Sequence, residues 1–299
     1  SMNEDCWDRL RRSGQIAAQA LQLGMDMVDD GVRLLDVAEE IESYIRSKGA
    51  QPAFPVNLSI NEVAAHYTPG HNDKLRFDPG DVVKVDVGAH IDGYVGGDTA
   101  GTVEVGSKRN HELIASAVKA RDMVMEVIGE GMPMNGIGRM VEGSITGDGY
   151  RPVANLTGHQ IDRFNLHAGL TIPNVDDGNL NPVKDGMVLA IEPFATNGEG
   201  LIKAGKPGNI YRVLRERPLK DPELKVFFDR LREEFQTLPF CDRWCTSFDS
   251  KAEAKINKLV RHGLVSSYAT LVEVKRGCVT QSEHTVLIRG RKAEILTLP

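Results

Sequence analysis

Apolar positions along the chain follow two patterns, which predict two kinds of element. Leu34, Val37 and Ile41 recur at intervals of three or four residues, the spacing of one face of an α-helix. The segments GDVVKVD (80–86) and GMVLAIE (186–192) each hold a mostly apolar run after a glycine, which is typical of a buried β-strand. Each run ends on a carboxylate, a group that buried positions rarely carry.

The helical pattern occurs twice, at an offset of 100 residues, because residues 17–52 align without gaps on residues 117–152. The two copies share apolar positions, a break (DDG against GEG) and a Gly/Pro turn at their ends. Each copy therefore predicts a helix, a break, a second helix and a turn into strands. Two amphipathic helices can resemble each other by chance, but common breaks at one offset favour a duplication.

Two such halves predict an α+β fold with pseudo-twofold symmetry, in which helices cover one face of an antiparallel sheet. The strand segments 80–86 and 186–192 occupy corresponding places in the two halves. A histidine precedes each of them, His66 in AAHYTP and His159 in TGHQID. A site at the symmetry axis would draw its ligands from both halves.

A helical insert interrupts the second half. The segment DPELKVFFDRLREEFQTLP predicts a capped helix with Leu224 and Phe228 on its apolar face, and SKAEAKINKLVRHG predicts another helix. Strand patterns return after the insert. We therefore predict a catalytic domain of residues 2–205 and 269–299, and an insert of residues 206–268.

Composition narrows the class of protein. The chain has 299 residues, of which 41% are hydrophobic and 26% charged, and its net charge is -6. These values are those of an ordinary globular protein without a basic patch, so we expect no nucleic-acid partner. No apolar run is long enough to predict a membrane span, and the N-terminus does not resemble a secretory signal. Four cysteines do not make a disulfide framework. We expect reduced thiols and a cytoplasmic location.

Carboxylates stand at four strand positions where the apolar pattern predicts burial. Any one of them could be a surface residue of a one-sided sheet. Two come from a hairpin in the first half and two from the matching strands of the second half, so a real duplication would bring them to one face. The four are Asp86, Asp98, Glu192 and Glu283.

Such convergence requires protons or cations. Two like charges 4 Å apart repel by about 4 kcal/mol at an effective dielectric constant of 20. Four carboxylates must therefore have strongly raised pKa values or bind metal. Two divalent ions would balance the formal charge, and one neutral imidazole could complete the set. Mostly oxygen ligands suit Mn²⁺, Fe²⁺ or Co²⁺ at least as well as zinc. Two metals can activate a water, as in aminopeptidases.

Five motifs in order resemble those of type II methionine aminopeptidases of the archaeal form, in metallopeptidase family M24. They are FPVNLSINEVAAHYTP, KVDVGAHIDGY with DTAGTV, TGHQI with LHAG, AIEPF, and QSEHTVLIR, and they extend from Phe54 to Arg289. The helical insert also resembles that form. The resemblance implies a pita-bread fold, whose internal symmetry agrees with the offset of 100 residues.

The resemblance also implies an activity: removal of the initiator methionine from proteins with a small second residue, by a water or hydroxide that bridges two metal ions. The metals would be Co, Mn, Fe or Zn. Their ligands would be Asp86, Asp98, His159, Glu192 and Glu283, with Asp98 and Glu283 bridging. The partners would be the N-termini of nascent polypeptides and the ribosome, and the protein would be a monomer.

Roles in catalysis follow from the same resemblance. Glu192 would carry protons between the attacking water and the departing amine. His66 would lie near the substrate and its leaving group, and His167 would contact the scissile amide or stabilise the tetrahedral intermediate. Phe54 would form part of the methionine pocket. From spacing alone, His66 and His167 would be assigned structural roles, and the resemblance reverses that interpretation.

The other histidines are expected to be structural or exposed. His284 follows Glu283 directly, so on a strand it would point to the opposite face. The remaining four are His71, His90, His111 and His262.

One spacing departs from the family. Asp86 and Asp98 are one residue further apart than the corresponding pair in type II methionine aminopeptidases. Asp92-Gly93 predicts a type I′ hairpin turn. A regular hairpin there would place Asp98 opposite Val87, facing away from Asp86. A β-bulge restores the parity, and we predict one at Gly96-Gly97, because glycines tolerate bulge dihedral angles.

Two other functions stay open on the sequence alone. An X-Pro aminopeptidase or prolidase shares the fold, but those enzymes usually carry a large N-terminal domain, for which this chain has no room. A non-catalytic relative that binds other proteins would lack several ligands, whereas all five are present here.

Overall fold

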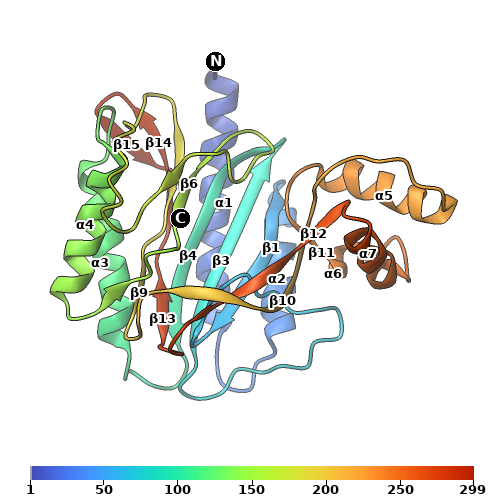
Figure 1. The fold of residues 1–299 in the computed structure, drawn as a ribbon, viewed down its shortest axis with the longest axis horizontal. Coiled ribbons are helices and arrows are strands. Elements are labelled where there is room, and N and C mark those ends of the chain that lie inside the picture. Colours follow the sequence, from blue (N-terminus) through green and yellow to red (C-terminus); the bar gives the residue numbers. More distant parts are fainter. Residues whose placement is uncertain (1) are drawn as a thin grey trace.

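The computed structural model describes residues 2–299 (Figure 1). Its four long helices repeat as predicted. They are α1 (Glu4–Met27), α2 (Leu34–Ser47), α3 (His111–Val127) and α4 (Met134–Gly147). α1 and α3 end 100 residues apart, and α2 and α4 both start and end 100 residues apart. The breaks between the helices are also equivalent, because Gly31 and Gly131 have φ angles of 78° and 91°. The predicted duplication is confirmed.

The strands form four hydrogen-bonded groups rather than the one continuous sheet that we predicted, and every pairing between them is antiparallel. In the first half the order is β1-β3-β4, formed by β1 (Gln51–Ile60), β3 (Val82–Ile91) and β4 (Tyr94–Glu104). In the second half the order is β15-β14-β8-β6-β7, formed by β6 (Gly158–Ile161), β7 (Thr171–Ile172), β8 (Val188–Ile191), β14 (His284–Arg289) and β15 (Lys292–Ile295).

An isolated β-bridge connects a strand of the first half to the second half. Glu283 donates its backbone N–H to the carbonyl of Ala100 at 3.0 Å, and this bridge lies where β4 meets the start of β14. A smaller group of order β13-β9-β5 comprises β5 (Arg151–Pro152), β9 (Phe194–Thr196) and β13 (Val279–Gln281). The bridge therefore brings two predicted site strands, one from each half, side by side.

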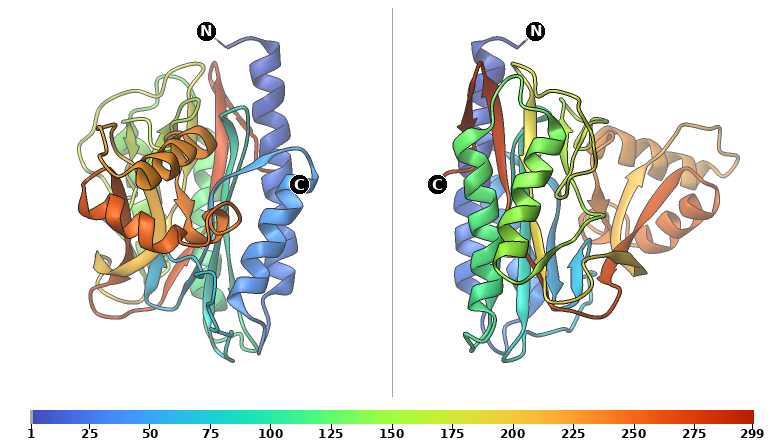
Figure 2. Two further views of the ribbon diagram at one scale, coloured as in Figure 1. Left: turned by 90° about the vertical axis from the view of Figure 1, so that its right-hand side faces the viewer. Right: turned by 60° about the vertical axis from the view of Figure 1, so that its left-hand side comes forward.

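Each helix pair packs on the strands of its own half. Ala17, Val37 and Ile41 share a buried cluster with Val83 and Val85, whereas α3 and α4 bury their apolar faces against β8 and β14. Figure 2 (left) shows α1 and α2 on one side of the strands and the helices of the insert on the other side. The face of the strands that is turned away from α1 and α2 is therefore available for a site.

The insert has its own core and is carried by a long β-hairpin. Its helices are α5 (Pro222–Phe235), α6 (Asp242–Cys245) and α7 (Ala252–Arg261), and the strand β11 (Phe240–Cys241) precedes α6. The hairpin consists of β10 (Ile202–Val213) and β12 (Val265–Glu273), and β12 also pairs with β2 (Val63–Ala65).

The first insert helix forms as its sequence predicts. Asp221 caps α5 by accepting from the backbone N–H of Glu223 at 3.0 Å, and Leu224 and Phe228 are buried in the insert core. The predicted domain boundaries fall within β10 and β12, which extend from the body of the protein into the insert.

The β3–β4 hairpin contains the predicted turn and bulge. Asp92 and Gly93 have φ angles of 52° and 84°, as a type I′ turn requires. Past the turn the register shifts, so that one residue of β3 opposes two of β4, and Asp98 then pairs with Gly88. Since Gly88 lies two residues after Asp86, both carboxylates are on one face. The predicted bulge is confirmed, but it lies at Val95-Gly96, one residue earlier than expected.

The reason for the two glycines differs from our prediction. Gly96 and Gly97 do not have positive φ angles, so their conformational freedom is not what the bulge uses. Instead, α1 lies directly on them. A Cβ at Gly96 would lie 1.8 Å from the carbonyl oxygen of Leu10, and one at Gly97 would lie 2.4 Å from the Cβ of Ala17. The glycines allow helix and bulge to approach each other closely.

The Ser13 hydroxyl of α1 is a hydrogen-bond partner for backbone groups of the bulge. Its hydroxyl accepts from the N–H of Gly96 at 2.9 Å and lies 3.1 Å from the carbonyl of Tyr94. We expect Ser13→Ala to lower the free energy of unfolding by about 1–3 kcal/mol, because it leaves a buried N–H without a partner. Chemical denaturation would measure this. Ser47→Ala removes an exposed hydroxyl that bonds its own helix, and it should change stability by less than about 0.5 kcal/mol. Equal effects would contradict the role of Ser13.

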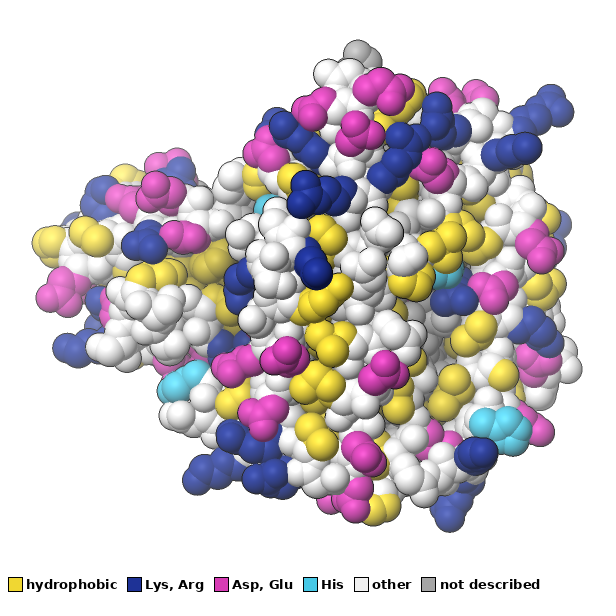
Figure 3. All heavy atoms as spheres, turned by 180° about the vertical axis from the view of Figure 1, so that it is seen from behind, with side chains coloured by type: hydrophobic (Ala, Val, Ile, Leu, Met, Phe, Trp, Pro, Cys, Tyr) yellow, Lys and Arg dark blue, Asp and Glu magenta, His cyan; other side chains and the backbone are white. Residues whose placement is uncertain are grey.

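The surface charges, the polarity of the helices and the state of the cysteines bear on the expectations drawn from composition. On the face shown in Figure 3, Lys and Arg side chains lie among Asp and Glu side chains. Across residues 2–299, each helix is too short or too polar to cross a membrane. All four cysteines are free thiols.

Candidate metal centre and substrate cleft

A cavity of about 370 Å³ opens on the face of the strands opposite α1 and α2. Both halves of the fold and the insert contribute to its wall. Seven of the eight predicted site residues line it: Phe54, His66, Asp86, Asp98, His159, His167 and Glu192. The eighth, Glu283, is fully buried behind the cavity wall, and it lies within 4.8 Å of three of the others, atom to atom.

Four of these residues converge on one point. Asp98, His159, Glu192 and Glu283 each offer one ligand atom, and these atoms all lie within 4.8 Å of one another. Nε2 of His159 is 3.2 Å from Oδ2 of Asp98 and 3.3 Å from Oε2 of Glu192. Each residue comes from a different strand or strand end, so the folded sheet, rather than any local sequence, creates the cluster.

Asp86 extends the cluster along β3. One of its carboxylate oxygens accepts from the side-chain amide of Gln281 at 3.2 Å, whereas the other is buried without a hydrogen-bond partner. Burial, together with the nearby charges of Asp98 and Glu192, raises the pKa of Asp86 well above its usual range. This carboxylate therefore needs either a proton or a cation.

Glu283 also needs a proton or a cation, and its need is greater than that of Asp86. Both of its carboxylate oxygens are buried without a partner, and burial followed by the charges of Asp98 and Glu192 raises its pKa well above the usual range. The pKa of His159 is raised as well, but for a histidine this favours the charged form. Burial lowers its pKa, but hydrogen bonds to Asp98 and Glu192 outweigh that effect and raise it to about 10. Without a metal ion, protonation of His159 would supply positive charge to these carboxylates.

The donor set fits divalent metal. Four carboxylates and one imidazole nitrogen match the preference of first-row divalent ions for oxygen and nitrogen ligands. The unpartnered oxygens of Asp86 and Glu283 are buried acceptors that a native protein normally satisfies. A cation bound among them would supply the positive charge that a proton otherwise provides. It would also give these buried oxygens a partner.

Backbone contacts hold the ligand strands together. Asp98 donates its N–H to the hydroxyl of Thr285 at 3.1 Å, and that hydroxyl lies 2.7 Å from the carbonyl of Asp98. The side-chain amide of Asn174 donates to the carbonyl of Glu192 at 3.1 Å. These contacts fix the main chain at two candidate ligands, so the strands that carry the carboxylates are held close together.

His66 lies at the cavity wall with an unusual backbone. Its φ angle is 72°, a left-handed conformation that costs a residue with a side chain on the order of 1–3 kcal/mol. Gly208 makes the conformation possible, because a Cβ there would lie 1.7 Å from the carbonyl oxygen of His66. The His66 ring packs edge-on against Tyr268 at 5.3 Å between centroids. Burial lowers the pKa of His66 to about 4, so the ring is neutral at pH 7.

His167 faces the cluster from a loop after β6. Its ring centroid is 4.4 Å from that of His159. Burial within the cleft, and then the charge of His159, lowers its pKa to about 3, although the residue remains exposed to solvent through the cleft. A neutral imidazole that solvent can reach is available to bind a substrate.

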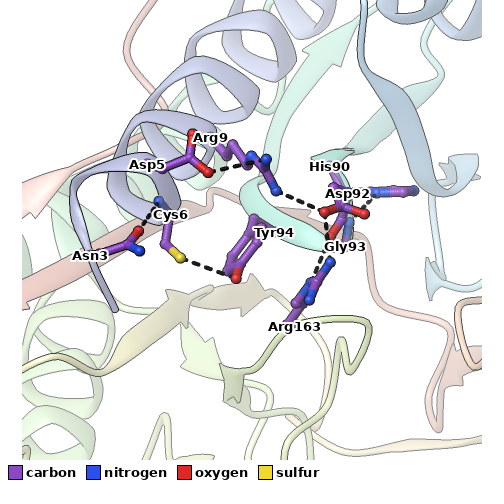
Figure 4. A network of polar contacts seen from close by, with 9 residues as sticks. All are labelled: Asn3, Asp5, Cys6, Arg9, His90, Asp92, Gly93, Tyr94 and Arg163. Carbon is purple, nitrogen blue, oxygen red and sulfur yellow. Dashed lines mark hydrogen bonds and ion pairs between the residues drawn. The ribbon is translucent and has the colours of Figure 1, made fainter. Parts of the chain in front are cut away.

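The type I′ turn of the first half positions this loop (Figure 4). Asp92 accepts ion-pair contacts from Arg163 at 2.6 Å and from Arg9 of α1 at 2.7 Å. The backbone N–H of Phe164 donates to the carbonyl of Gly93 at 2.9 Å. The loop that carries His167 is thereby anchored to both α1 and the β3–β4 hairpin.

Phe54 depends on a glycine of the neighbouring strand. A Cβ at Gly88 would lie 2.3 Å from the Phe54 ring, so only glycine leaves room for it there. Because Gly88 pairs with Asp98, the ring lies beside one of the candidate metal ligands. Leu238 of the insert packs in the same buried cluster as Phe54 and Leu166. One wall of the cavity is therefore apolar.

Several residues of the site were not anticipated from the sequence. Gln281 and Thr285 flank the predicted Glu283 at intervals of two residues, and this strand periodicity could have predicted that they share its face. Tyr268 and Pro239 also line the cavity, but they come from the insert and its hairpin, and no local pattern marks them. His284 behaves as predicted, since its Nδ1 lies 2.7 Å from the hydroxyl of Thr297.

Comparison with known proteins agrees with this architecture. The sequence pattern of metallopeptidase family M24 matches residues 8–288. A methionine aminopeptidase of Methanocaldococcus jannaschii is 40% identical over 296 residues, covering 99% of this chain and 100% of that protein. A methionine aminopeptidase of Archaeoglobus fulgidus is 41% identical over 298 residues, covering 99% and 100%.

Solved structures share the fold at lower identity. A methionine aminopeptidase of Thermotoga maritima superposes with a TM-score of 0.74 at 22% identity, covering 100% of this chain and 98% of that one. A thermophilic Arx1 superposes with a TM-score of 0.87 at 16% identity, covering 100% and 92%. A prolidase of Pyrococcus furiosus has a TM-score of 0.64 at 18% identity, and the chain covers 65% of it.

The structural similarities establish the fold, and the sequence matches extend over nearly the whole chain. This protein belongs to metallopeptidase family M24 and has its pita-bread fold.

Proposed function

We propose that the protein is a methionine aminopeptidase of the archaeal type II kind, which removes an N-terminal methionine when the second residue is small. The observation that carries this proposal is the group of buried carboxylates beside His159 at the wall of a half-apolar cleft. The names of the archaeal relatives support the same activity.

Five residues would hold two divalent ions: Asp86, Asp98, His159, Glu192 and Glu283. Asp98 and Glu283 are the most deeply buried carboxylates of this set, at 3% and 0% exposure, so they would hold the ions on the side away from the cleft. The ions would be Co, Mn, Fe or Zn. When bound, they supply Lewis acidity and the means to activate water at neutral pH.

The protein's own residues would then move protons and orient the substrate. Glu192 lines the cleft and its side chain is 13% exposed, so it would accept the proton of the attacking water and pass it to the departing amine. His167 is neutral and would donate an N–H to the scissile carbonyl as negative charge develops on its oxygen. His66, also neutral, would contact the substrate beside the leaving group.

The apolar wall would select the substrate. Phe54 offers an aromatic ring that suits the thioether of methionine, since sulfur packs favourably against aromatic rings. A small second residue would pass between this wall and the histidines. The nascent polypeptide is the proposed partner, and a ribosome contact, a cytoplasmic location and a monomeric state stay predictions of the sequence.

Cleavage of two peptides side by side tests the proposal. We expect protein loaded with Mn²⁺ or Co²⁺ to release methionine from Met-Ala-Ser and to leave an X-Pro peptide intact, because the cleft is small and one wall is apolar. Released amino acids would be quantified by chromatography. Cleavage of the X-Pro peptide alone would identify a prolidase-like enzyme. Cleavage of neither peptide, by protein that also binds no metal, would identify a non-catalytic relative.

A further inference from the structure

A buried ion pair connects the insert to the body of the protein close to the cleft. Arg243 of α6 donates from Nη1 to Oε1 of Glu42 at 2.6 Å and from Nη2 to Oε2 at 3.0 Å. Glu42 belongs to α2 and is 1% exposed, and Arg243 is 8% exposed. Both charged groups are buried, so this pair differs from the weak surface ion pairs that form and break freely.

The remaining donors of Arg243 reach a different segment. Its Nη2 donates to the hydroxyl of Thr68 at 2.9 Å, and its Nε donates to the carbonyl of Pro69 at 2.7 Å. Thr68 is fully buried. One planar guanidinium therefore joins a helix of the body to residues 68–69, a geometry that a lysine ammonium cannot reproduce because it lacks the fork of donors.

Residues 68–69 lie two and three positions after His66 in the chain. His66 holds a left-handed backbone conformation, which persists only when its surroundings determine it. On one side its N–H donates to the side-chain oxygen of Asn57 at 3.0 Å. On the other side the N–H of Thr68 donates to the carbonyl of Gly208 at 3.0 Å. Arg243 holds the segment immediately beyond this second contact.

We propose that Arg243 is a positioning residue, supplied by the insert, that holds His66 in place for its contact with the substrate. This inference rests on the proposed function, in which His66 meets the substrate in the cleft. It assigns the insert a task in catalysis: the insert carries the guanidinium that Glu42 orients and that restrains the chain after His66. Glu42 is itself fixed, because it also accepts from the N–H of Val56 at 3.0 Å and from the indole of Trp244 at 3.1 Å.

The first test measures the segment directly, without reference to activity. In Arg243→Lys the amide of Thr68 should exchange its hydrogen at least about 10-fold faster than in the native protein, because its segment loses two contacts. Arg232→Lys is a matched control. Arg232 forms the same two-pronged pair with Glu216, but on the surface of the insert, at 3.0 Å and 2.9 Å. Unchanged exchange at Thr68 in Arg243→Lys would overturn the proposal.

A double-mutant cycle tests whether Arg243 acts through His66. In the metal-loaded protein Arg243→Lys should lower kcat/KM for Met-Ala-Ser by about 10- to 100-fold, because small displacements of a positioned group are costly. In a His66→Ala background the same change should cost less than about 2-fold, since there is no ring left to position. A full loss in both backgrounds would show that Arg243 acts independently of His66 and would overturn the proposal.

A milder variant covers the case in which Arg243→Lys does not fold. Thr68→Val keeps the Glu42–Arg243 pair and removes only the hydroxyl that Arg243 contacts. Faster exchange at residue 68, with a smaller fall in kcat/KM, is expected, and native values of both would refute the inference. Failure of the native protein to cleave any methionyl peptide would refute the proposed function instead, and the exchange experiment would still decide whether Arg243 restrains the segment.

Discussion

Glu283→Gln is expected to abolish peptide cleavage and, at the same time, to make the metal-free protein more stable. Glu283 is a fully buried carboxyl whose two oxygens have no partner and whose pKa is raised by burial and by neighbouring carboxylates. Removing its charge relieves repulsion in the metal-free state. The same change removes a proposed metal ligand, so kcat/KM should fall more than about 100-fold, which exceeds the loss typical of residues that only hydrogen-bond to ligands.

Glu273 provides a matched control for this experiment. It is also fully buried, but each of its carboxylate oxygens accepts backbone N–H groups, among them those of Lys275 at 2.8 Å and Gly277 at 3.0 Å. Burial raises its pKa, but these hydrogen bonds outweigh burial and leave its pKa below the usual value. Glu273→Gln should therefore destabilise the metal-free protein.

Thermal denaturation in chelator would measure both variants, and peptide cleavage would be assayed after metal loading. A Glu283→Gln protein that is less stable than the native one without metal, or that keeps its activity, would contradict the assignment of Glu283 as a ligand under repulsion.

Metal removal is expected to destabilise the native protein, and more so as the pH rises. Asp86 and Glu283 have folded-state pKa values raised above their ordinary values of 3.8 and 4.5, so their protonated forms favour folding. That contribution is complete below those ordinary values and is lost as the pH rises through the folded-state pKa values. The pKa of His159 is raised from 6.5 to about 10, and its stabilising charge is lost across that interval.

Metal binding has the opposite dependence, because ligands bind metal in their deprotonated forms. The melting temperatures of the loaded and the chelated protein should therefore diverge between pH 6.5 and pH 9. With free metal at 100 times its Kd the stabilisation is about 2.7 kcal/mol, which corresponds to roughly 4 °C for a chain of 299 residues. Calorimetry at several pH values would measure the difference. A difference in melting temperature between loaded and chelated protein that narrows with rising pH would contradict a site made of these residues. Glu283→Gln should reduce this difference.

Most of the fold could be predicted because the chain contains its pattern twice. The breaks after α1 and α3, and the limits of α2 and α4, follow local signals that do not depend on distant residues. The insert helix α5 begins directly after Asp221 for the same reason, since a capping side chain acts within a few residues. The carboxylates of Asp86 and Glu192 could be recognised as candidate ligands because a charge directly after an apolar run is costly when buried unless it has a partner.

Other features depended on contacts between distant segments. The bulge could be predicted from parity, but its position at Val95-Gly96 and the need for glycine were decided by the approach of α1 to the backbone of β4. The bridge between Ala100 and Glu283 likewise joins residues that lie far apart in the sequence.

The sequence by itself therefore determined the duplication, the helices and the chemical character of the site, because periodicity, caps and misplaced charges are local properties. Only the tertiary structure decided which side chains share the buried volume at the junction of the halves. It also decided that Arg243 of the insert reaches the chain beside His66. Steric fit and the shielding of charges from water arise only when segments far apart in sequence pack together, so no local pattern predicts them.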